Sequence, residues 1–236
     1  MTQYAFYFDG TRCSGCKTCV YACKDTYDLG PGRVYRRVFE YAGGTTTKDK
    51  NGYITTDCYS YPISVSCNHC DQASCIAACP TGAMKKDGET GLVYVDKDQC
   101  IGCGSCAVAC PYSAPTIDHE QKRSVKCDGC MALVKKGEVP VCVASCPARA
   151  LDFGTTEEIK AKYPDAIMLD MAPMPNPNDT LPNMFVKPSK DARLWTDREG
   201  ELANRVITTG LSGLSRRCSR ATTTMLLRKQ NASANC

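Results

Sequence analysis

The sequence has 236 residues, of which 43% are apolar and 19 are cysteine, and its formal charge is +4. So many cysteines in a chain of this length indicate bound metal, because disulfide staples are typical of much shorter secreted folds. Six Lys and Arg residues but no acid lie in residues 205–236, so the rest of the chain is net negative, which disfavours nucleic-acid binding.

The chain also lacks the features of a membrane-spanning or self-exported protein. No window holds the roughly 18 uninterrupted apolar residues that a membrane span needs. Residues 1–5 carry neither the basic nor the apolar region of an export signal. We therefore expect no membrane span, and transport by a partner if the chain works outside the cytoplasm.

A strand-forming apolar run, residues 6–8, opens the chain, and Asp9 follows it four residues before the first of four cysteine groups. Group one has the spacing C-x2-C-x2-C-x3-C and consists of Cys13, Cys16, Cys19 and Cys23. Tyr, Val and Arg alternate through residues 30–62, with a Gly and Thr turn at 43–47. This pattern predicts an insertion of strands and turns after group one.

Group two has the spacing C-x2-C-x4-C-x3-C before a proline and consists of Cys67, Cys70, Cys75 and Cys79. The turn-forming residues 87–91 then separate two apolar runs, 83–84 and 92–95, which predicts a hairpin. Group three repeats the spacing of group one, four residues after Asp96, and consists of Cys100, Cys103, Cys106 and Cys110. A second proline, Pro115, predicts a loop after this group.

Group four again ends in C-x3-C before a proline and consists of Cys127, Cys130, Cys142 and Cys146. The residues after it repeat the shape of those after group two, so we expect a strand at 150–151 to pair with the strand at 6–8. Six of the 13 prolines fall within residues 164–188, among Met and apolar residues, which excludes a long helix. This segment is predicted to be an extended arm that is buried on another protein.

The cysteine spacing indicates iron–sulfur clusters. A [4Fe–4S] cluster needs four thiolates, and in two-cluster ferredoxins the last cysteine of each run, before the proline, binds the other cluster. Zinc is the alternative for group four alone, because a zinc site uses two cysteine pairs separated by about a dozen residues. Disulfides are a further alternative, but they give no reason for a fourfold repeat.

Pairing group one with group four, and group two with group three, predicts four [4Fe–4S] clusters. Each cluster takes three ligands from one group and the fourth from its pair. The predicted ligands, called sets A to D below, are Cys13, Cys16, Cys19 and Cys146 for cluster A; Cys23, Cys127, Cys130 and Cys142 for cluster B; Cys79, Cys100, Cys103 and Cys106 for cluster C; and Cys67, Cys70, Cys75 and Cys110 for cluster D.

The predicted fold class is α+β, with two nested ferredoxin-like modules that hold two clusters each. The outer module comprises residues 1–29 and 111–163, and the inner module comprises residues 63–110. The strand and turn insertion covers residues 30–62, the extended docking arm covers residues 164–204, and a disordered basic tail covers residues 205–236.

The remaining candidates receive supporting roles. No nucleotide-binding motif and no nucleophile with an adjacent base is present, so no catalytic residue is predicted. Three cysteines fall outside the groups: Cys58 is predicted to be buried as a small apolar residue, and Cys218 and Cys236 to be incidental thiols. His69 and His119 are predicted to support the sites or lie at the surface. Four cations flank ligands and either offset cluster charge or face solvent, namely Arg12, Lys17, Lys126 and Arg149.

The motifs at residues 15–19, 67–70, 100–103 and 126–130, with those at 39–44, 150–154 and 201–204, resemble the iron–sulfur subunits of complex molybdopterin oxidoreductases. The resemblance is strongest to the electron-transfer B subunit of the anaerobic dimethyl sulfoxide reductase family, and it covers about residues 1–204. Group three keeps Cys103, where some members of the family carry tryptophan. The basic tail has no counterpart in the family.

This resemblance implies an electron-transfer role without catalysis, between a molybdopterin catalytic subunit and an integral membrane anchor that oxidises quinol. It implies that electrons run through clusters D, C, B and A in that order. It also implies membrane association through these partners, with co-export beside the catalytic subunit to the extracytoplasmic face; the cytoplasmic face stays open. The alternatives are a subunit of another molybdopterin complex (formate dehydrogenase, tetrathionate or polysulfide reductase) and a free polyferredoxin.

Overall fold

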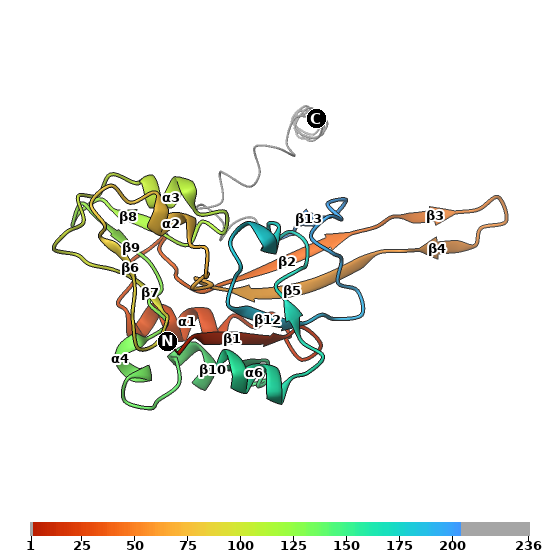
Figure 1. Ribbon diagram of the computed structural model, residues 1–236. Coiled ribbons are helices and arrows are strands. Elements are labelled where there is room, and N and C mark those ends of the chain that lie inside the picture. The colour runs from red at the N-terminus through yellow and green to blue at the C-terminus, as the bar shows by residue number, and fades with distance from the viewer. Residues whose placement is uncertain (1, 204–236) are drawn as a thin grey trace, which may run out of the picture.

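The structure is a computed structural model that describes residues 2–203 (Figure 1). A four-stranded sheet in the order β10-β1-β12-β11 forms its base. Strand β1 pairs antiparallel with β10 and parallel with β12, which confirms the strand pairing predicted between the two ends of the cysteine region. The bounds of these strands are β1 Tyr4–Asp9, β10 Leu151–Thr155, β11 Ile167–Met168 and β12 Met184–Lys187.

The two faces of this sheet are covered by different layers. Because alternate residues of a strand point to opposite faces, Tyr7 of β1 contacts helix α6 (Thr156–Lys162) while Phe6 and Phe8 enter the main core. Helix α6 begins with a capping box, in which Thr155 and Glu158 satisfy each other's backbone N–H groups. On the core face lie α1 (Thr18–Thr26), α4 (Met131–Val134) and α5 (Val141–Ala144).

A second unit of small elements carries groups two and three at one end of the molecule (Figure 1). Strands β6 (Met84–Lys86) and β7 (Val93–Val95) pair antiparallel, which confirms the predicted hairpin. A loop follows group three, as Pro115 predicted, and leads into a further hairpin. The remaining elements here are α2 Ser74–Ala77, α3 Ser105–Ala109, β8 Thr116–Asp118 and β9 Arg123–Val125.

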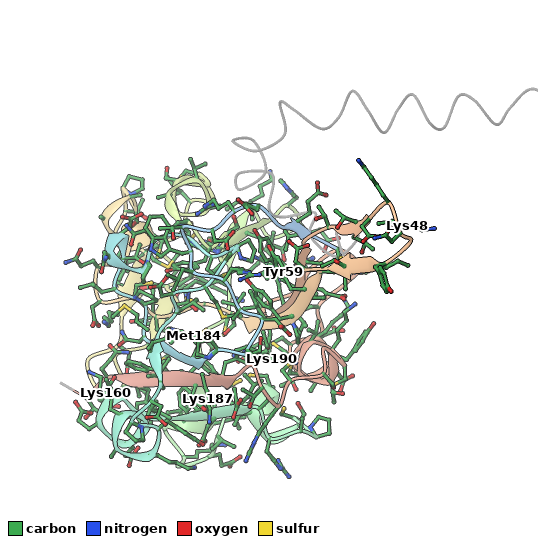
Figure 2. All side chains as sticks on the ribbon, turned by 90° about the vertical axis from the view of Figure 1, so that its right-hand side faces the viewer. Lys48, Tyr59, Lys160, Met184, Lys187 and Lys190 are labelled. Atoms are coloured by element: carbon green, nitrogen blue, oxygen red, sulfur yellow. The ribbon has the colours of Figure 1, made fainter. Side chains whose placement is uncertain are left out.

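The region after group one contains strands, as predicted. Strands β2 and β5 pair antiparallel over seven residues each, and β13 joins the outer edge of β2. Beyond them β3 and β4 form a hairpin that projects from the body, with Lys48 near its end (Figures 1 and 2). The bounds are β2 Arg37–Gly43, β3 Thr46–Lys48, β4 Ile54–Thr56, β5 Tyr59–Val65 and β13 Glu201–Leu202.

In the segment predicted to be an arm docked on another protein, 164–204, the part from 169 to 186 instead contributes to this chain's own core. Strand β12 lies between β1 and β11, and Figure 2 shows Met184 within the body of the molecule. A short 3₁₀ turn, Pro177–Asp179, connects β11 to β12. Of the apolar residues that suggested a partner's surface, Met168 is half-buried and the others are buried, namely Leu169, Met171, Met174, Met184, Phe185 and Val186.

The physical reason for this correction is that β1 has two edges. β10 covers one, and an uncovered second edge would leave a row of backbone groups unpaired. Residues 184–187 contain no proline, so they can form that strand although prolines flank them. The predicted tail, 205–236, with Cys218 and Cys236, lies outside the described residues. Within residues 2–203 no helix is long and apolar enough to cross a bilayer.

Candidate iron–sulfur sites

Each cysteine group combines a tight loop with a short helix. In group one the chain turns through Gly15 and Lys17, both with positive φ, and α1 then begins. Cys19 and Cys23 lie on one face of α1 because they are four residues apart. The third cysteine of every other group also lies on a short helix: α2, α3 or α5. The loops therefore present the first cysteines, and the helices direct the later ones inward.

The aspartate before groups one and three shapes the entry into each loop. Asp9 Oδ1 accepts a hydrogen bond from the Thr11 N–H at 2.9 Å, and Asp96 Oδ1 accepts one from the Asp98 N–H at 3.1 Å. An aspartate that bonds the backbone two residues on closes a local turn. The aspartate repeat in the sequence therefore fixes the direction of the chain ahead of the first ligand.

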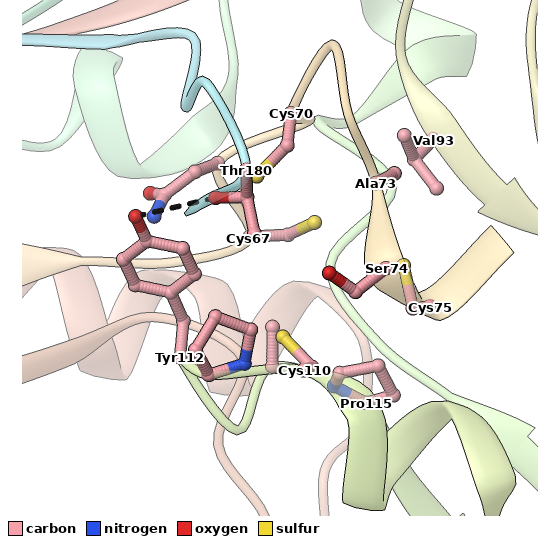
Figure 3. Close-up of a pocket in the computed structure, with 13 residues that line it drawn as sticks. Cys67, Cys70, Ala73, Ser74, Cys75, Val93, Cys110, Tyr112, Pro115 and Thr180 are labelled. Carbon is pink, nitrogen blue, oxygen red and sulfur yellow. Dashed lines mark hydrogen bonds between the residues drawn. The ribbon is translucent and has the colours of Figure 1, made fainter. Parts of the chain in front are cut away.

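Set D surrounds a single pocket (Figure 3). Its four cysteines line this pocket: Cys67, Cys70 and Cys75 from group two, and Cys110 from group three. Tyr112 forms part of the wall, and its hydroxyl accepts a hydrogen bond from Thr180 at 3.5 Å. The pocket thus brings together cysteines from two groups in the combination that the crossover rule predicted.

Set C surrounds a second pocket, nearer the surface. Cys79 of group two lines it together with the first three cysteines of group three. Ser124, on β9, lies against the site: its N–H donates to Cys100 Sγ at 3.3 Å, and its hydroxyl lies 3.3 Å from Cys106 Sγ. Cys103 is exposed, so the β8–β9 hairpin covers one side of the pocket and leaves the other near solvent.

The loop of set C needs a glycine at residue 102. Gly102 has a φ of 68°, and a Cβ there would lie 2.2 Å from the Lys122 carbonyl oxygen at the turn of the β8–β9 hairpin. Any other residue would be strained by its backbone and would also push the hairpin away. The hairpin that covers the site is therefore held close by this glycine.

Sets A and B, which groups one and four form, are interleaved in the same way. Burial raises the pKa of Cys13 to about 11, and the neighbouring charges that add to the shift are those of Cys19, Cys146 and Cys16. Burial likewise raises the pKa of Cys23 to about 12, with Cys142 and then Cys130 as charged neighbours. The last cysteine of group four thus lies with group one, and the last cysteine of group one lies with group four.

These buried thiols share one chemical property. Burial raises the pKa of Cys70 and of Cys75 to about 12, as it does for Cys23, and it raises the pKa of Cys127 further. Thiols in such surroundings hold their protons at neutral pH, whereas a metal-bound thiol is deprotonated outright. Binding of iron at these positions would therefore release protons from the protein.

The structure corrects the order of the sets. Set D lies beside set B, because Cys67 and Cys127 pack in one cluster of buried residues; Cys67 is also, after burial, the neighbour that most raises the pKa of Cys127. Set A also adjoins set B, because Cys19 and Cys142 belong to the same apolar cluster. Set C adjoins set D, through the apolar cluster that contains Cys75 and Cys106. The order is therefore A, B, D, C rather than the D, C, B, A that the family resemblance implied.

Buried donors without partners fit clusters at these positions. Within residues 2–203 the buried atoms that lack a hydrogen-bond partner include Arg36 Nε, Asn68 Nδ2 and His69 Nε2. Asn68 lines the pocket of set D. A buried donor without an acceptor costs about 1–3 kcal/mol, and hydrogen bonds to sulfur are among the features that tune cluster potentials. The sulfur atoms of bound clusters would supply the missing acceptors.

Of the cations and histidines that lie next to the cysteines in the sequence, some are buried beside the cysteine sets and others lie at the surface. Lys126 is buried, and its Nζ donates to Cys67 Sγ at 3.6 Å, whereas Arg12 and Arg149 are exposed and Lys17 is half-buried. His69 is buried and its Nδ1 accepts a hydrogen bond from the Val93 N–H at 2.8 Å. His119 is exposed. Arg36, which is fully buried among the sets, was missed, because nothing in the sequence distinguishes it from the adjacent Arg37.

The prediction that Cys58 is buried was wrong. Cys58 is exposed, with its Sγ 3.5 Å from the Thr46 hydroxyl. The register of the β2–β5 pair ends at Gly43 and Tyr59, so Cys58 falls just outside the ladder, at the base of the projecting hairpin. The alternation seen at Tyr59 and Tyr61 does not extend to it.

No three His, Cys, Asp or Glu side chains in residues 2–203 stand close enough to hold a single metal ion. The cysteines of set D instead stand around a wider space (Figure 3). Four thiols around such a space are the donor set of a cluster core with four iron corners.

Comparison with known proteins also indicates iron–sulfur cluster binding. A 4Fe–4S dicluster domain family matches residues 58–156, and a 4Fe–4S binding domain family matches residues 11–32. The sequence is 48% identical over 203 residues to YnfG, a probable anaerobic dimethyl sulfoxide reductase subunit of Escherichia coli strain K12, covering 86% of this chain and 97% of that protein.

Two further relatives show similarity to this chain at different levels of sequence identity. The sequence is 47% identical over 204 residues to the B subunit of the anaerobic dimethyl sulfoxide reductase of Haemophilus influenzae, covering 86% of this chain and 98% of that protein. It is 37% identical over 161 residues to the thiosulfate reductase electron transfer subunit PhsB of Salmonella typhi, covering 66% of this chain and 78% of that protein. This protein therefore belongs to the family of anaerobic dimethyl sulfoxide reductase B subunits, the iron–sulfur electron-transfer subunits of these reductases.

Proposed function

We propose that this chain holds four [4Fe–4S] clusters in sets A to D and conducts electrons from a quinol-oxidising membrane anchor to a molybdopterin catalytic subunit. The observation that carries the proposal is the arrangement of the sixteen cysteines into four interleaved sets in the order A, B, D, C. When bound, [4Fe–4S] clusters supply one-electron transfer. The contribution of the chain itself is to hold the sets in a row, bury the inner ones and tune their surroundings.

The two ends of the row support entry and exit of electrons there. Cys103 of set C and Cys16 of set A are exposed, whereas every cysteine of set B is buried. An electron delivered at set C would therefore pass sets D and B before it leaves at set A. We assign set C to the membrane anchor and set A to the catalytic subunit, with this chain and the catalytic subunit on the extracytoplasmic face after joint export.

The nested domain division supports the same interpretation. The outer module, 1–29 and 111–163, closes through the β1–β10 pair, and the inner module, 63–110, contains the β6–β7 hairpin. We propose that each module holds two clusters, with sets A and B in the outer one and sets C and D in the inner one. The β8–β9 hairpin belongs to the outer module by sequence but lies against set C, so it joins the two.

The greater identity to dimethyl sulfoxide reductase subunits, 47–48% against 37% for the thiosulfate reductase subunit, favours dimethyl sulfoxide as the terminal acceptor. The segment that suggested a docked partner, and so spoke against a free polyferredoxin, is internal to this chain. An experiment on the native complex tests both the terminal acceptor and the free polyferredoxin alternative. The complex is purified from membranes and reduced anaerobically with a quinol analogue. Dimethyl sulfoxide, but not thiosulfate, should reoxidise the cluster signals seen by electron paramagnetic resonance (EPR). Reoxidation by thiosulfate alone, or purification of a partner-free chain, would refute the proposal.

The surface beside set C carries exposed apolar side chains that a docked membrane anchor would cover. Ile101 is 65% exposed and Val108 is 90% exposed, and Ile101 lines the pocket of set C. Ile101→Glu should therefore weaken binding to the membrane anchor by about tenfold or more, because a buried carboxylate would replace an apolar contact. The measurement is the fraction of the protein that remains in washed membranes.

Ile54→Glu is the matched control for this prediction. Ile54 is 69% exposed on β4 of the projecting hairpin, away from set C (Figure 1). This variant should keep membrane binding at the level of the unmodified protein. Equal retention of both variants in membranes would place the anchor elsewhere.

A further inference from the structure

Arg36 is a buried cation in the middle of the molecule. It is 1% exposed and lies just before β2, between groups one and two in the sequence. Its guanidinium donates to the Ser66 hydroxyl at 3.0 Å and to the Ser64 hydroxyl at 3.2 Å, and it stacks over the Phe6 ring at 4.7 Å. Its Nη1 also donates to the Ser64 carbonyl oxygen at 3.4 Å, and its Nε–H has no hydrogen-bond partner.

No carboxylate balances this charge. Among the ion pairs of residues 2–203, none includes Arg36. Two serine hydroxyls and an aromatic face offer only neutral partners. A buried charge that lacks an opposite charge costs several kcal/mol, so a stable fold with Arg36 in this place needs negative charge nearby.

The cysteines of sets A and B would supply that negative charge once they bind iron, because a metal-bound thiol is deprotonated. The Ser64 hydroxyl joins Arg36 to Cys19, since it lies 3.2 Å from Arg36 Nη1 and 3.5 Å from Cys19 Sγ. Burial by itself would lower the pKa of Arg36, but the neighbouring Cys142, Cys19 and Cys127 raise it. Cys19 belongs to set A, and Cys142 and Cys127 belong to set B. Arg36 therefore lies between the two sets, within electrostatic reach of both.

Each one-electron reduction adds a negative charge to a cluster, and a fixed positive charge beside it stabilises the reduced form. The effect is strong in a dry interior, where water does not screen it. Arginine suits this position because it keeps its charge at any physiological pH. Its planar guanidinium also presents donors in fixed directions toward two neighbours at once.

We propose that Arg36 is a positioning residue for electron transfer, a permanent positive charge shared by sets A and B that raises the reduction potentials of both clusters. This inference rests on the proposed cluster assignment and deepens it. Lys126, which donates to Cys67 and lies beside Cys127, occupies the corresponding place between sets B and D. The contact between sets D and C is apolar, through Cys75, Val93 and Cys106, so set C serves as an internal reference.

The test is an anaerobic redox titration of the native membrane complex with dithionite, followed by EPR. In Arg36→Gln the ratio of reduced to oxidised cluster at a fixed potential should fall about tenfold for clusters A and B, which is about 59 mV for a one-electron couple. Cluster C should not change. Arg36→Lys keeps the charge, so its potentials for A and B should lie near those of the unmodified protein.

Arg37→Gln is the matched control. Arg37 is also buried and donates to the backbone carbonyls of Tyr112 and Ser113, on the side of Cys110 in set D. Its replacement should leave clusters A and B unshifted while disturbing the interior to a similar degree. A shift of A and B in Arg37→Gln equal to that in Arg36→Gln would overturn the proposal and show a merely structural effect.

The other outcomes are equally decisive. Clusters A and B present in Arg36→Gln at unchanged potentials would refute the role of Arg36 while the cluster assignment stands. Absence of four clusters from the unmodified complex would instead refute the proposed function. If Arg36→Gln assembles no cluster A or B, Arg36→Lys decides: unchanged potentials support the charge as the cause, and a tenfold fall rejects it.

Discussion

Replacing Cys146 with serine should abolish cluster A, although Cys146 belongs to group four of the sequence. Cys146 is buried, and it is one of the neighbours that raise the pKa of Cys13, at the start of group one. A serine hydroxyl is a much poorer ligand for iron than a thiolate, so the fourth corner of cluster A would be lost or exchanged. The EPR signal of cluster A should disappear from the reduced complex, and quinol-dependent reduction of dimethyl sulfoxide should stop, because set A is the exit of the proposed row.

The control for this variant is Cys58→Ser. Cys58 is exposed and lies outside all four sets, so its replacement should leave every cluster signal and the activity unchanged. Disappearance of the cluster B signal in Cys146→Ser, with cluster A intact, would show that group four keeps all its own cysteines. The crossover assignment of sets A and B would then be wrong.

Replacing Leu169 with alanine should lower the free energy of unfolding by about 2–5 kcal/mol. Leu169 is 0% exposed, in the segment after β11 that the sequence suggested as a docking arm, and it belongs to the main apolar cluster with Phe6 and Met184. Truncation there removes buried methyl groups and leaves a cavity that the neighbouring side chains fill only in part. The measurement is the midpoint of urea unfolding, which is monitored through the loss of the visible absorbance of the clusters.

Leu194→Ala is the matched control, because Leu194 is 58% exposed in the same C-terminal region. It should shift the midpoint little, since surface substitutions of this kind usually change stability by less than about 0.5 kcal/mol. If Leu169→Ala left the isolated protein as stable as Leu194→Ala but weakened its complex with a partner, the docking-arm prediction would be restored.

The pattern of cysteines could be predicted from the sequence because the constraint on it is local. Three ligands of a cluster must come from one tight loop, so their spacing is visible over a few residues. Asp9 and Asp96 act over two residues through a hydrogen bond to the backbone, so their repeat was also visible. The β1–β10 pairing and the β6–β7 hairpin followed from the same repeats and are confirmed.

The predictions that were wrong concern features that depend on distant parts of the chain. Cys58 has the sequence surroundings of a strand, but the register of β2 against β5 decides that the ladder ends before it. The apolar residues around Leu169 and Met184 indicate burial without saying on what surface. The free edge of β1, more than 150 residues earlier in the chain, settles that they are buried within this chain.

By itself, therefore, the sequence determined which cysteines form groups, which chemistry they serve and which strands enclose them, because loop spacing and strand repeats are short-range properties. Only the tertiary structure decided the order of the sets, since the approach of Cys67 to Cys127 joins two groups that no spacing connects. It also decided that Arg36, and not Arg37 beside it, lies between sets A and B. Where a buried arginine side chain points depends on packing against residues from distant parts of the chain. The local sequence around it therefore does not predict its position.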